Sequence, residues 1–387
     1  MSEDDFSLPE RGIVFWPVGV GDSTTIVIDP GTVLQVDLHH LESSEDDEDP
    51  RKPIVDRLIE LLPERDGTPY LAGFAATHLD ADHILGFAEL VERVTIGDLW
   101  FTPRIFRDVD EGTLCDDGKV FVEEAERRID KVRAEGTVVS GDRIRIIGHD
   151  EMLSEPPYSE LPSETFVIPG EFLTAVDGTD HQDCFRTFIH APFKDDGSKD
   201  RNDTSLAMQI TLTEGDHTLN ALLLGDLSYP DLKNIFARSK AEDLLWNAFL
   251  APHHCSRGAM YWPEEQGGEP KLRQDILDAI KTAADSPGII VVSADKIPAS
   301  NKAGDNPPHA KAANRYREIA PDGVICTGQH PDADAPEPLV LEVTGDGPAL
   351  CDAPVVAESA ARLAKAISDA RGEEQVPSAP VGFGRRK

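Results

Sequence analysis

The chain has 387 residues, of which 40% are hydrophobic, so it can bury a sizeable core in one large domain or two ordinary ones. Its 72 acidic and 37 basic residues give a formal net charge of −35. This charge argues against a broad basic face for duplex DNA, because lysine and arginine supply most of the non-specific affinity for phosphates. A local basic groove or a bound divalent metal could still accommodate a phosphate group.

The cysteine pattern and the N-terminus bear on where the protein works. The five cysteines are scattered and form no CxxC pair, which argues against a disulfide framework or a thiolate zinc site. The acidic start MSEDDFSLPERG has no apolar segment of the kind that a signal peptide needs. No apolar run approaches the roughly 18 residues of a membrane-spanning helix. We therefore expect a cytoplasmic protein that does not engage a membrane.

The first half of the chain opens with β-rich runs that turn residues separate, which predicts an antiparallel start. Strands are expected at residues 13–18, 24–29, 32–38 and 70–76, and a hairpin strand within 137–148. Helices are expected at residues 53–62, 84–93 and 119–135.

The second half begins with a segment rich in Pro, Ser, Asp and Gly, residues 149–200, which we interpret as a loop-rich insertion. Strands are then expected at residues 205–212, 218–226, 244–252, 288–294, 323–327 and 338–344, with helices at 229–238, 271–284 and 308–319. Residues 351–387 are predicted to form a C-terminal helix and a disordered tail. Strands covered by external helices indicate a two-sheet α/β sandwich within one large domain, residues 1–350.

Potential metal ligands follow the strand at residues 70–76. The sequence HLDADH places His78, Asp80, Asp82 and His83 within six positions. Carboxylates in a tight turn can face two different cations, and imidazoles can bracket them. The alternative is a helix N-cap, in which Asp80 or Asp82 accepts hydrogen bonds from free backbone N–H groups.

Two further strands end in the same kind of residue. LLLGDLS ends an apolar strand with Asp226, which is suited to bridge two cations, although an N-cap is again the alternative. LAPHHCSRG ends another apolar strand with His253 and His254. A single buried histidine is usually a core residue, but an adjacent pair after a strand indicates a metal site.

These motifs, taken in order, resemble a known family. HxDxDHxxG, then NDTSL at 202–206, then LLLGD and APHH resemble the metallo-β-lactamase fold. They are most similar to its ComEC-like branch, the soluble hydrolase domain of competence DNA-uptake proteins and their free-standing relatives. The opening VGVGDSTTIVID and the segment 291–316 resemble that branch's first and last motifs. The resemblance implies an αββα sandwich of two mixed sheets with external helices.

The resemblance also implies roles for individual residues. His78 and Asp80 would bind a first metal, Asp82 and His83 a second, and Asp226 would bridge them. We favour His253 as the remaining ligand, with His254 behind it or in contact with substrate. Asp37 would brace the metal loop, and Asn202, Asp203 and Ser205 would line the site. His309 would contact the phosphate or protonate the leaving group; the alternative is that it caps a helix.

The sequence departs from the family at several positions. Asp80 stands where the widespread motif has histidine, and a separate third-motif histidine is not evident; His190 is more simply a core residue. Cys255 replaces a glycine, which we interpret as a feature of the turn rather than as a reactive thiol. Zn²⁺ remains the expected metal for a site of histidine and aspartate ligands. Mn²⁺ becomes an alternative, because carboxylate is a harder ligand than the imidazole it replaces.

The resemblance implies a hydrolase that activates hydroxide with two divalent ions, Asp82 orienting the water or accepting its proton. The leading hypothesis is a phosphodiesterase acting on nucleic acid. Because no membrane-spanning segment is expected, the chain would not itself be an uptake channel, and a protein partner could deliver it to DNA. One alternative is hydrolysis of a small phosphodiester or other small ester, which the negative charge favours. Another is a non-catalytic metal-binding partner subunit.

Overall fold

The computed structural model describes residues 6–46, 48–110, 112–148, 156, 158–193 and 201–351. Residues Leu8–Ala353 form one compact unit, and of the other, Met1–Ser7 with Pro354–Lys387, only residues 6 and 7 are described. The predicted C-terminal helix and tail therefore lie outside the described residues, as does part of the predicted insertion, and the domain boundaries stay a prediction. None of the described helices is long and apolar enough to span a membrane.

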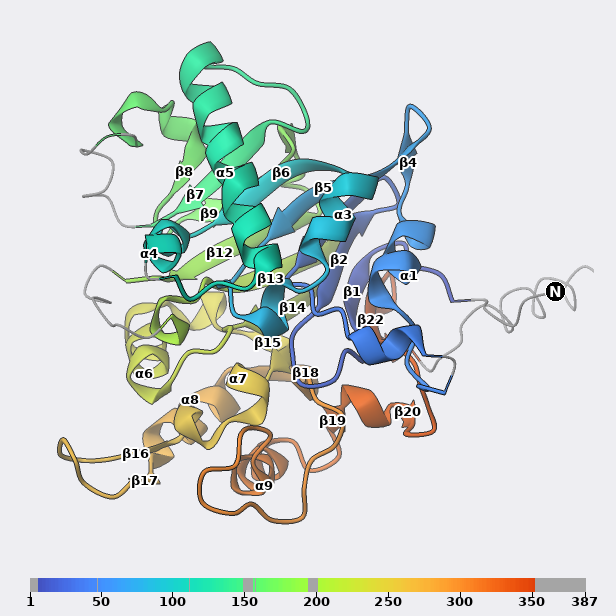
Figure 1. Ribbon diagram of the computed structural model, residues 1–387. Helices are drawn as coiled ribbons and strands as arrows, with labels where there is room; N and C mark the ends of the chain where they lie inside the picture. Colours follow the sequence, from blue (N-terminus) through green and yellow to red (C-terminus); the bar gives the residue numbers. More distant parts are fainter. Residues whose placement is uncertain are drawn as a thin grey trace, which may run out of the picture. The chain divides into compact units, whose positions relative to one another are not determined.

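Two mixed sheets form the centre of the unit. In Figure 1 the first is blue to green, apart from its orange-red strands at residues 339–351, and the second is green to orange. The first has the order β23 (Gly347–Cys351), β22 (Leu339–Thr344), β1 (Gly12–Phe15), β2 (Thr24–Asp29), β3 (Thr32–Val36), β5 (Thr68–Ala75), β6 (Thr95–Phe101), β7 (Arg143–Ile147) and β8 (Phe166–Val167), with β4 (Glu64–Arg65) beside β5. The second has the order β19 (Val324–Cys326), β18 (Ala284–Val292), β15 (Trp246–Leu250), β14 (His217–Leu223), β13 (Ala207–Glu214), β12 (Phe185–Ala191) and β9 (Phe172–Leu173).

Each sheet is half antiparallel and half parallel. In the first, β23 to β3 pair antiparallel, and β3, β5, β6, β7 and β8 pair parallel. In the second, β9 to β14 pair antiparallel, and β14, β15, β18 and β19 pair parallel. Short two-stranded pairs lie outside these sheets: β10 (Ala175–Val176) with β11 (Thr179–Asp180), β16 (Tyr261–Trp262) with β17 (Lys271–Leu272), and β20 (Pro331–Asp332) with β21 (Ala335–Pro336).

The central strands of the second sheet are buried on both faces: β15 is buried throughout, as are residues 219–223 of β14 and 289–292 of β18. Along β18, Ile289 and Val291 join the core cluster shared with the first sheet, whereas Ile290 and Val292 join a cluster with the helices. This alternation follows from the two-residue period of a strand. The helices of this outer layer are α6 (Tyr229–Arg238), α8 (Gln274–Thr282) and α9 (Ala310–Ile319), and α7 (Pro252–Cys255) is a single turn.

Other helices cover the first sheet. Aromatic rings carry the contact, with the Phe74 ring of β5 lying 5.0 Å from that of Phe87 and 6.0 Å from that of Phe121. The helices on this side are α1 (Ile54–Leu61), α2 (Ala81–Ile84), α3 (Phe87–Arg93), α4 (Arg104–Asp110) and α5 (Asp116–Glu135). The arrangement is the predicted αββα sandwich of two mixed sheets with external helices.

Three sequence-based expectations were wrong in detail. The described part of residues 149–200, predicted as a loop-rich insertion, contributes strands to both large sheets, including β12. These short apolar strands were not recognised because they are surrounded by Pro, Ser and Asp residues. Strand β7 pairs parallel with β6 and is not part of a hairpin. The helix expected at 84–93 is divided into α2 and α3 by Gly86, whose φ is 96°, a left-handed value that glycine adopts at little cost.

Candidate metal centre

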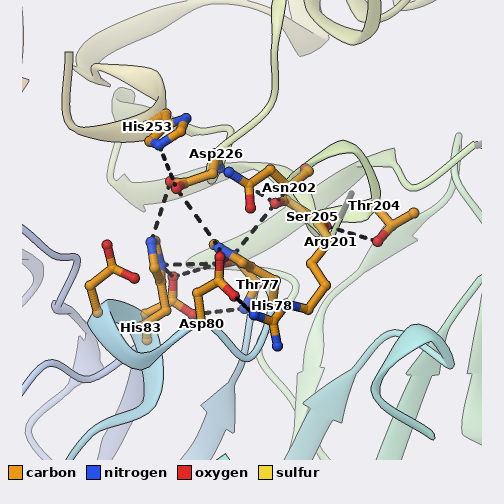
Figure 2. Close-up of polar contacts among 12 residues, drawn as sticks. Thr77, His78, Asp80, His83, Arg201, Asn202, Thr204, Ser205, Asp226 and His253 are labelled. Atoms are coloured by element: carbon orange, nitrogen blue, oxygen red, sulfur yellow. Dashed lines mark hydrogen bonds and ion pairs between the residues drawn. The ribbon is translucent and has the colours of Figure 1, made fainter. Parts of the chain in front are cut away.

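The predicted ligands follow the carboxyl ends of strands that are neighbours in the two sheets. His78 follows β5, Asp226 follows β14, and His253 and His254 follow β15. Strands β14 and β15 are parallel, as are β3 and β5, so in each sheet the two ends meet at one edge. Loops beyond the carboxyl ends of parallel strands are where α/β proteins place their ligands. Figure 2 shows the groups of the two sheets facing each other across this edge.

Asp226 is the centre of the cluster. Its Oδ1 lies 3.3 Å from His83 Nε2 and 3.8 Å from His254 Nε2. Its Oδ2 lies 3.8 Å from His78 Nε2 and 3.6 Å from His253 Nε2. Each carboxylate oxygen therefore faces a different pair of imidazoles, as a bridging carboxylate would; Figure 2 shows the contacts of Asp226 with His78, His83 and His253. The N-cap alternative does not apply, because Ser228 is the residue that precedes helix α6.

Asp37 contacts the loop that carries the predicted ligands His78 and His83. Its carboxylate accepts hydrogen bonds from the backbone N–H and the hydroxyl of Thr77, each at 2.7 Å, and lies 2.7 Å from His83 Nδ1. This contact fixes the ring of His83 so that Nε2 points at Asp226. Asp37 has a φ of 55°, a left-handed value that aspartate tolerates better than most residues.

Asp22 makes the equivalent contact on the other side of the cluster, and sequence reasoning did not assign it a role. Its Oδ1 lies 3.2 Å from His254 Nδ1, which leaves His254 Nε2 at 3.2 Å from Asp82 Oδ2. Strand β2 runs antiparallel to β3, so the residue just before β2 lies at the same edge as the end of β3. The sequence did contain a signal for this residue, since Asp22 is the aspartate of the opening motif VGVGDSTTIVID.

The structure buries His254 among the carboxylates more deeply than His253, which the sequence favoured as the direct ligand. His254 is 1% exposed and lies between Asp22, Asp82 and Asp226, whereas His253 is 34% exposed and contacts Asp226 alone among these carboxylates. Both have φ values near 50°, and Cys255 follows at 71°, so the three form a left-handed turn. Each such residue costs about 1–3 kcal/mol, which surrounding contacts must offset.

The alternative role proposed for the HLDADH loop, a side-chain cap of the following helix by Asp80, is not observed. Asp80 precedes α2, but its side chain makes no capping hydrogen bond; its Oδ2 lies 3.6 Å from His78 Nε2, and its Oδ1 pairs with Arg201. Arg201 was not singled out from the sequence. Ser205 Oγ lies 3.5 Å from His78 Nδ1, so the NDTSL segment does reach the cluster (Figure 2). Its neighbour Asp203 accepts from the Ser228 hydroxyl at 3.4 Å.

His309 is buried but is held by the backbone. Its Nδ1 accepts from the Arg257 N–H at 3.2 Å, so Nε2 carries the hydrogen and donates to the Asp305 carbonyl at 3.1 Å. The cap of helix α9 is supplied by Asn301, whose Oδ1 accepts from the Ala310 N–H at 2.7 Å. The proton of His309 is therefore engaged, and its role as acid stays a prediction.

His190 and Cys255 are core residues. His190 Nδ1 lies 2.7 Å from Ser239 Oγ, and burial lowers the pKa of its imidazole to about 4. Burial raises the pKa of the Cys255 thiol to about 12, so the thiolate that would react is not formed near neutral pH.

The buried atoms at the centre of the cluster fit a metal ion. His83 Nε2, His254 Nε2 and Asp226 Oδ1 are buried and have no hydrogen-bond partner in the described residues. Buried polar atoms without partners are costly, unless a ligand satisfies them. Ligand atoms of Asp22, His83, Asp226 and His254 all lie within 4.8 Å of one another. Imidazole and carboxylate together suit Zn²⁺ or Mn²⁺.

The charges in the cluster are mutually stabilised. Burial alone would lower the pKa of His83, but the carboxylates of Asp226 and Asp37 outweigh it and raise the pKa well above 6.5. The same balance, with Asp226 and Asp22, raises the pKa of His254 to about 10. Burial alone would raise the pKa of Asp226, but the charges of His83 and His254 hold it well below its ordinary value.

Metal binding at pH 7 should therefore release protons. Without metal, the neighbouring carboxylates raise the pKa of both His83 and His254 and so favour the protonated imidazoles at this pH. A ligating imidazole must be neutral, so binding should release about two protons, and affinity should rise as the pH increases from 7 toward 10. Calorimetry in buffers of different ionisation enthalpy measures the number released. His217→Ala, outside the cluster, should leave it unchanged, and a release of zero would contradict the protonation states.

Comparisons with known proteins bear on the fold alone. No family model and no curated protein matches the chain. Among solved structures, Zn(2+)-bound PqqB from Methylobacterium extorquens is 11% identical, covers 81% of this chain and 97% of its own, and gives a TM-score of 0.40. Rm3 metallo-beta-lactamase is 14% identical, with 72% and 90% covered and a TM-score of 0.34. BJP-1, a subclass B3 metallo-beta-lactamase of Bradyrhizobium japonicum, is 14% identical, with 82% and 90% covered and a TM-score of 0.32. With TM-scores of 0.32–0.40 and identities of 11–14%, these structures carry no argument about activity. The αββα assignment rests on the order and direction of the strands.

Proposed function

We propose that the chain is a metal-dependent hydrolase of phosphodiesters. The observation that carries this proposal is the buried cluster around Asp226, whose imidazole and carboxylate atoms point at one another without hydrogen-bond partners in the described part of the chain. His83, His254, Asp226 and Asp82 would hold a divalent ion. When bound, such an ion would activate water and neutralise charge on a phosphoryl group. The order of motifs, which resembles the ComEC-like branch, supports phosphodiesters as the substrate class.

Asp82 is suited to orient the attacking water rather than to take its proton. Burial alone would raise the pKa of Asp82, but the nearby imidazoles of His254 and His83 lower it well below its ordinary value. A carboxylate with so low a pKa is a weak base. The side chain of Asp82 is 36% exposed, so it can reach both the buried cluster and an incoming substrate.

The exposed side of the cluster supports a substrate that approaches from solvent. Asp80 and His253 are partly exposed, at 26% and 34%, whereas His83 and His254 are buried. Nucleic acid is the substrate class that the resemblance favours. The formal net charge of −35 instead favours a small phosphodiester. The non-catalytic alternative is a subunit that binds metal and hydrolyses nothing.

One series of assays separates these alternatives. Plasmid DNA, single-stranded RNA and bis(p-nitrophenyl) phosphate are incubated with the protein and either Mn²⁺ or Zn²⁺, and nitrocefin serves as a β-lactam comparison. We expect cleavage of DNA or RNA that chelation abolishes. Cleavage of the small ester alone would eliminate the nuclease assignment, and faster hydrolysis of nitrocefin would reject phosphodiesters. Less than about one bound ion per chain after reconstitution would favour the non-catalytic subunit.

A further inference from the structure

Arg201 brings a fixed positive charge to the exposed side of the cluster. Its Nη2 forms an ion pair with Asp80 Oδ1, and both side chains are mostly buried, with 21% and 26% of their surfaces exposed. Its Nη1 lies 3.4 Å from the Thr113 carbonyl and hydroxyl oxygens. The guanidinium is thus held between two elements, directly beside the carboxylate that the family resemblance assigns to the first metal (Figure 2).

The backbone that carries Arg201 is tied to the metal loop. The Arg201 carbonyl accepts from the Thr204 hydroxyl at 2.9 Å and from its N–H at 3.0 Å, which closes the turn Asn202–Thr204. The next residues reach the cluster, since the Leu206 N–H donates to the Thr77 carbonyl at 2.9 Å. The position of the guanidinium is therefore set by the same loops that present His78 and Asp226.

The two sides of Asp226 are unequal as metal sites. On the Oδ1 side, His83 and His254 are each oriented by a carboxylate behind them, and Asp82 lies 3.2 Å from His254 Nε2. On the Oδ2 side, His78 lies beside Asp80, one of whose oxygens is already paired with a cation, and His253 is 34% exposed. In the described residues, the group of potential ligands with closely spaced atoms is on the Oδ1 side. The donor set there fits a metal ion. On the other side the buried His78 Nε2 also has no hydrogen-bond partner in the described residues, but the carboxylate of Asp80 is already paired with the guanidinium of Arg201.

We propose that the centre holds one divalent ion, on the Oδ1 side of Asp226, and that the guanidinium of Arg201 takes the place of a second ion beside Asp80. This inference rests on the metal dependence in the proposed function. A guanidinium presents a planar fork of donors that matches the oxygens of a phosphate. Arg201 would hold a non-bridging oxygen of the phosphodiester, which a second metal would otherwise do.

Metal stoichiometry tests the inference without relying on hydrolysis. Equilibrium dialysis against Mn²⁺ or Zn²⁺ with elemental analysis, and calorimetric titration, should give about one ion per wild-type chain. Arg201→Ala frees Asp80 and removes a repelling charge, so a second ion should bind at least roughly tenfold more tightly. Arg201→Lys, which keeps the charge, should stay near one ion. Arg93→Ala is the matched control, because Arg93 pairs with Asp56 on the surface.

A double variant identifies the ligand of the added ion. Arg201→Ala combined with Asp80→Asn should return to one ion, because the carboxylate that the second ion needs is gone. Thermal unfolding of each metal-free variant checks that it is folded. Two ions of similar affinity in the wild type, with no change in Arg201→Ala, would overturn the inference while leaving the proposed hydrolase intact. One bound ion without hydrolysis of any phosphodiester would overturn the proposed hydrolase and leave the single-ion inference intact.

Discussion

Asp226→Asn is expected to remove most of the metal affinity and to reduce hydrolysis at least about 10³-fold, because metal assistance supplies several kcal/mol and each ~1.4 kcal/mol is tenfold. The substitution keeps the shape of the side chain but removes the charge at the point where four imidazoles converge. Dialysis with elemental analysis measures the bound metal, and initial rates on the best substrate of the assay series measure the chemistry.

The control for this variant is another buried aspartate. Asp243→Asn removes a carboxylate that is 3% exposed and lies outside the cluster, and it should leave metal content and rate nearly unchanged. Thermal unfolding of both variants separates loss of the site from loss of the fold. An Asp226→Asn protein that retains its metal and its rate would exclude Asp226 as the central ligand.

His254→Ala should weaken metal binding roughly 10²-fold or more, and His253→Ala should weaken it less than about tenfold. The reason is their burial and their partners: His254 is enclosed by three carboxylates, whereas His253 is a third exposed. The two variants remove the same atoms from neighbouring positions, so each is the control for the other. Calorimetric titration with Mn²⁺ and Zn²⁺ gives both affinities. A larger loss in His253→Ala would restore the order favoured from the sequence.

Asp22→Asn extends the same test to the residue behind the ring. The amide oxygen that this substitution introduces can still accept from His254 Nδ1, but it carries no negative charge, so the imidazole becomes a poorer ligand. Changes of this kind typically cost about 10–100-fold in metal affinity, which the same calorimetric titration measures. Asp37→Asn should act similarly through His83, to which Asp37 is the matching carboxylate. No effect from either substitution would mean that the rings are positioned by packing alone.

The layers of the fold could be predicted because apolar periodicity and turn residues are local signals. Helix α6 occupies the range expected for it, residues 229–238, and the strands on either side are long apolar runs. Strand β12 was missed because its seven residues stand among Pro, Ser and Asp-rich segments, where a short alternation is hard to recognise. The direction of β7 was wrong because pairing depends on a distant partner, β6, across helix α5.

For the candidate metal centre, the sequence alone determined which loops carry potential ligands. HLDADH, LLLGD and APHH each follow an apolar strand, and parallel strands bring such loops together at one edge. His78, His83, Asp226 and His254 were all named on that basis, and the structure places the three imidazoles around the carboxylate of Asp226.

Only the tertiary structure decided what each side chain faces. Asp22 and Arg201 act on residues that are distant in the chain, and no spacing rule connects position 201 with position 80. The choice between His253 and His254 depends on a left-handed turn, which sets one ring into the interior and leaves the other at the surface. Burial and charge pairing are properties of the assembled loops, so the ligand order and the proposed single-ion centre follow from the packing of the two sheets and not from the motifs.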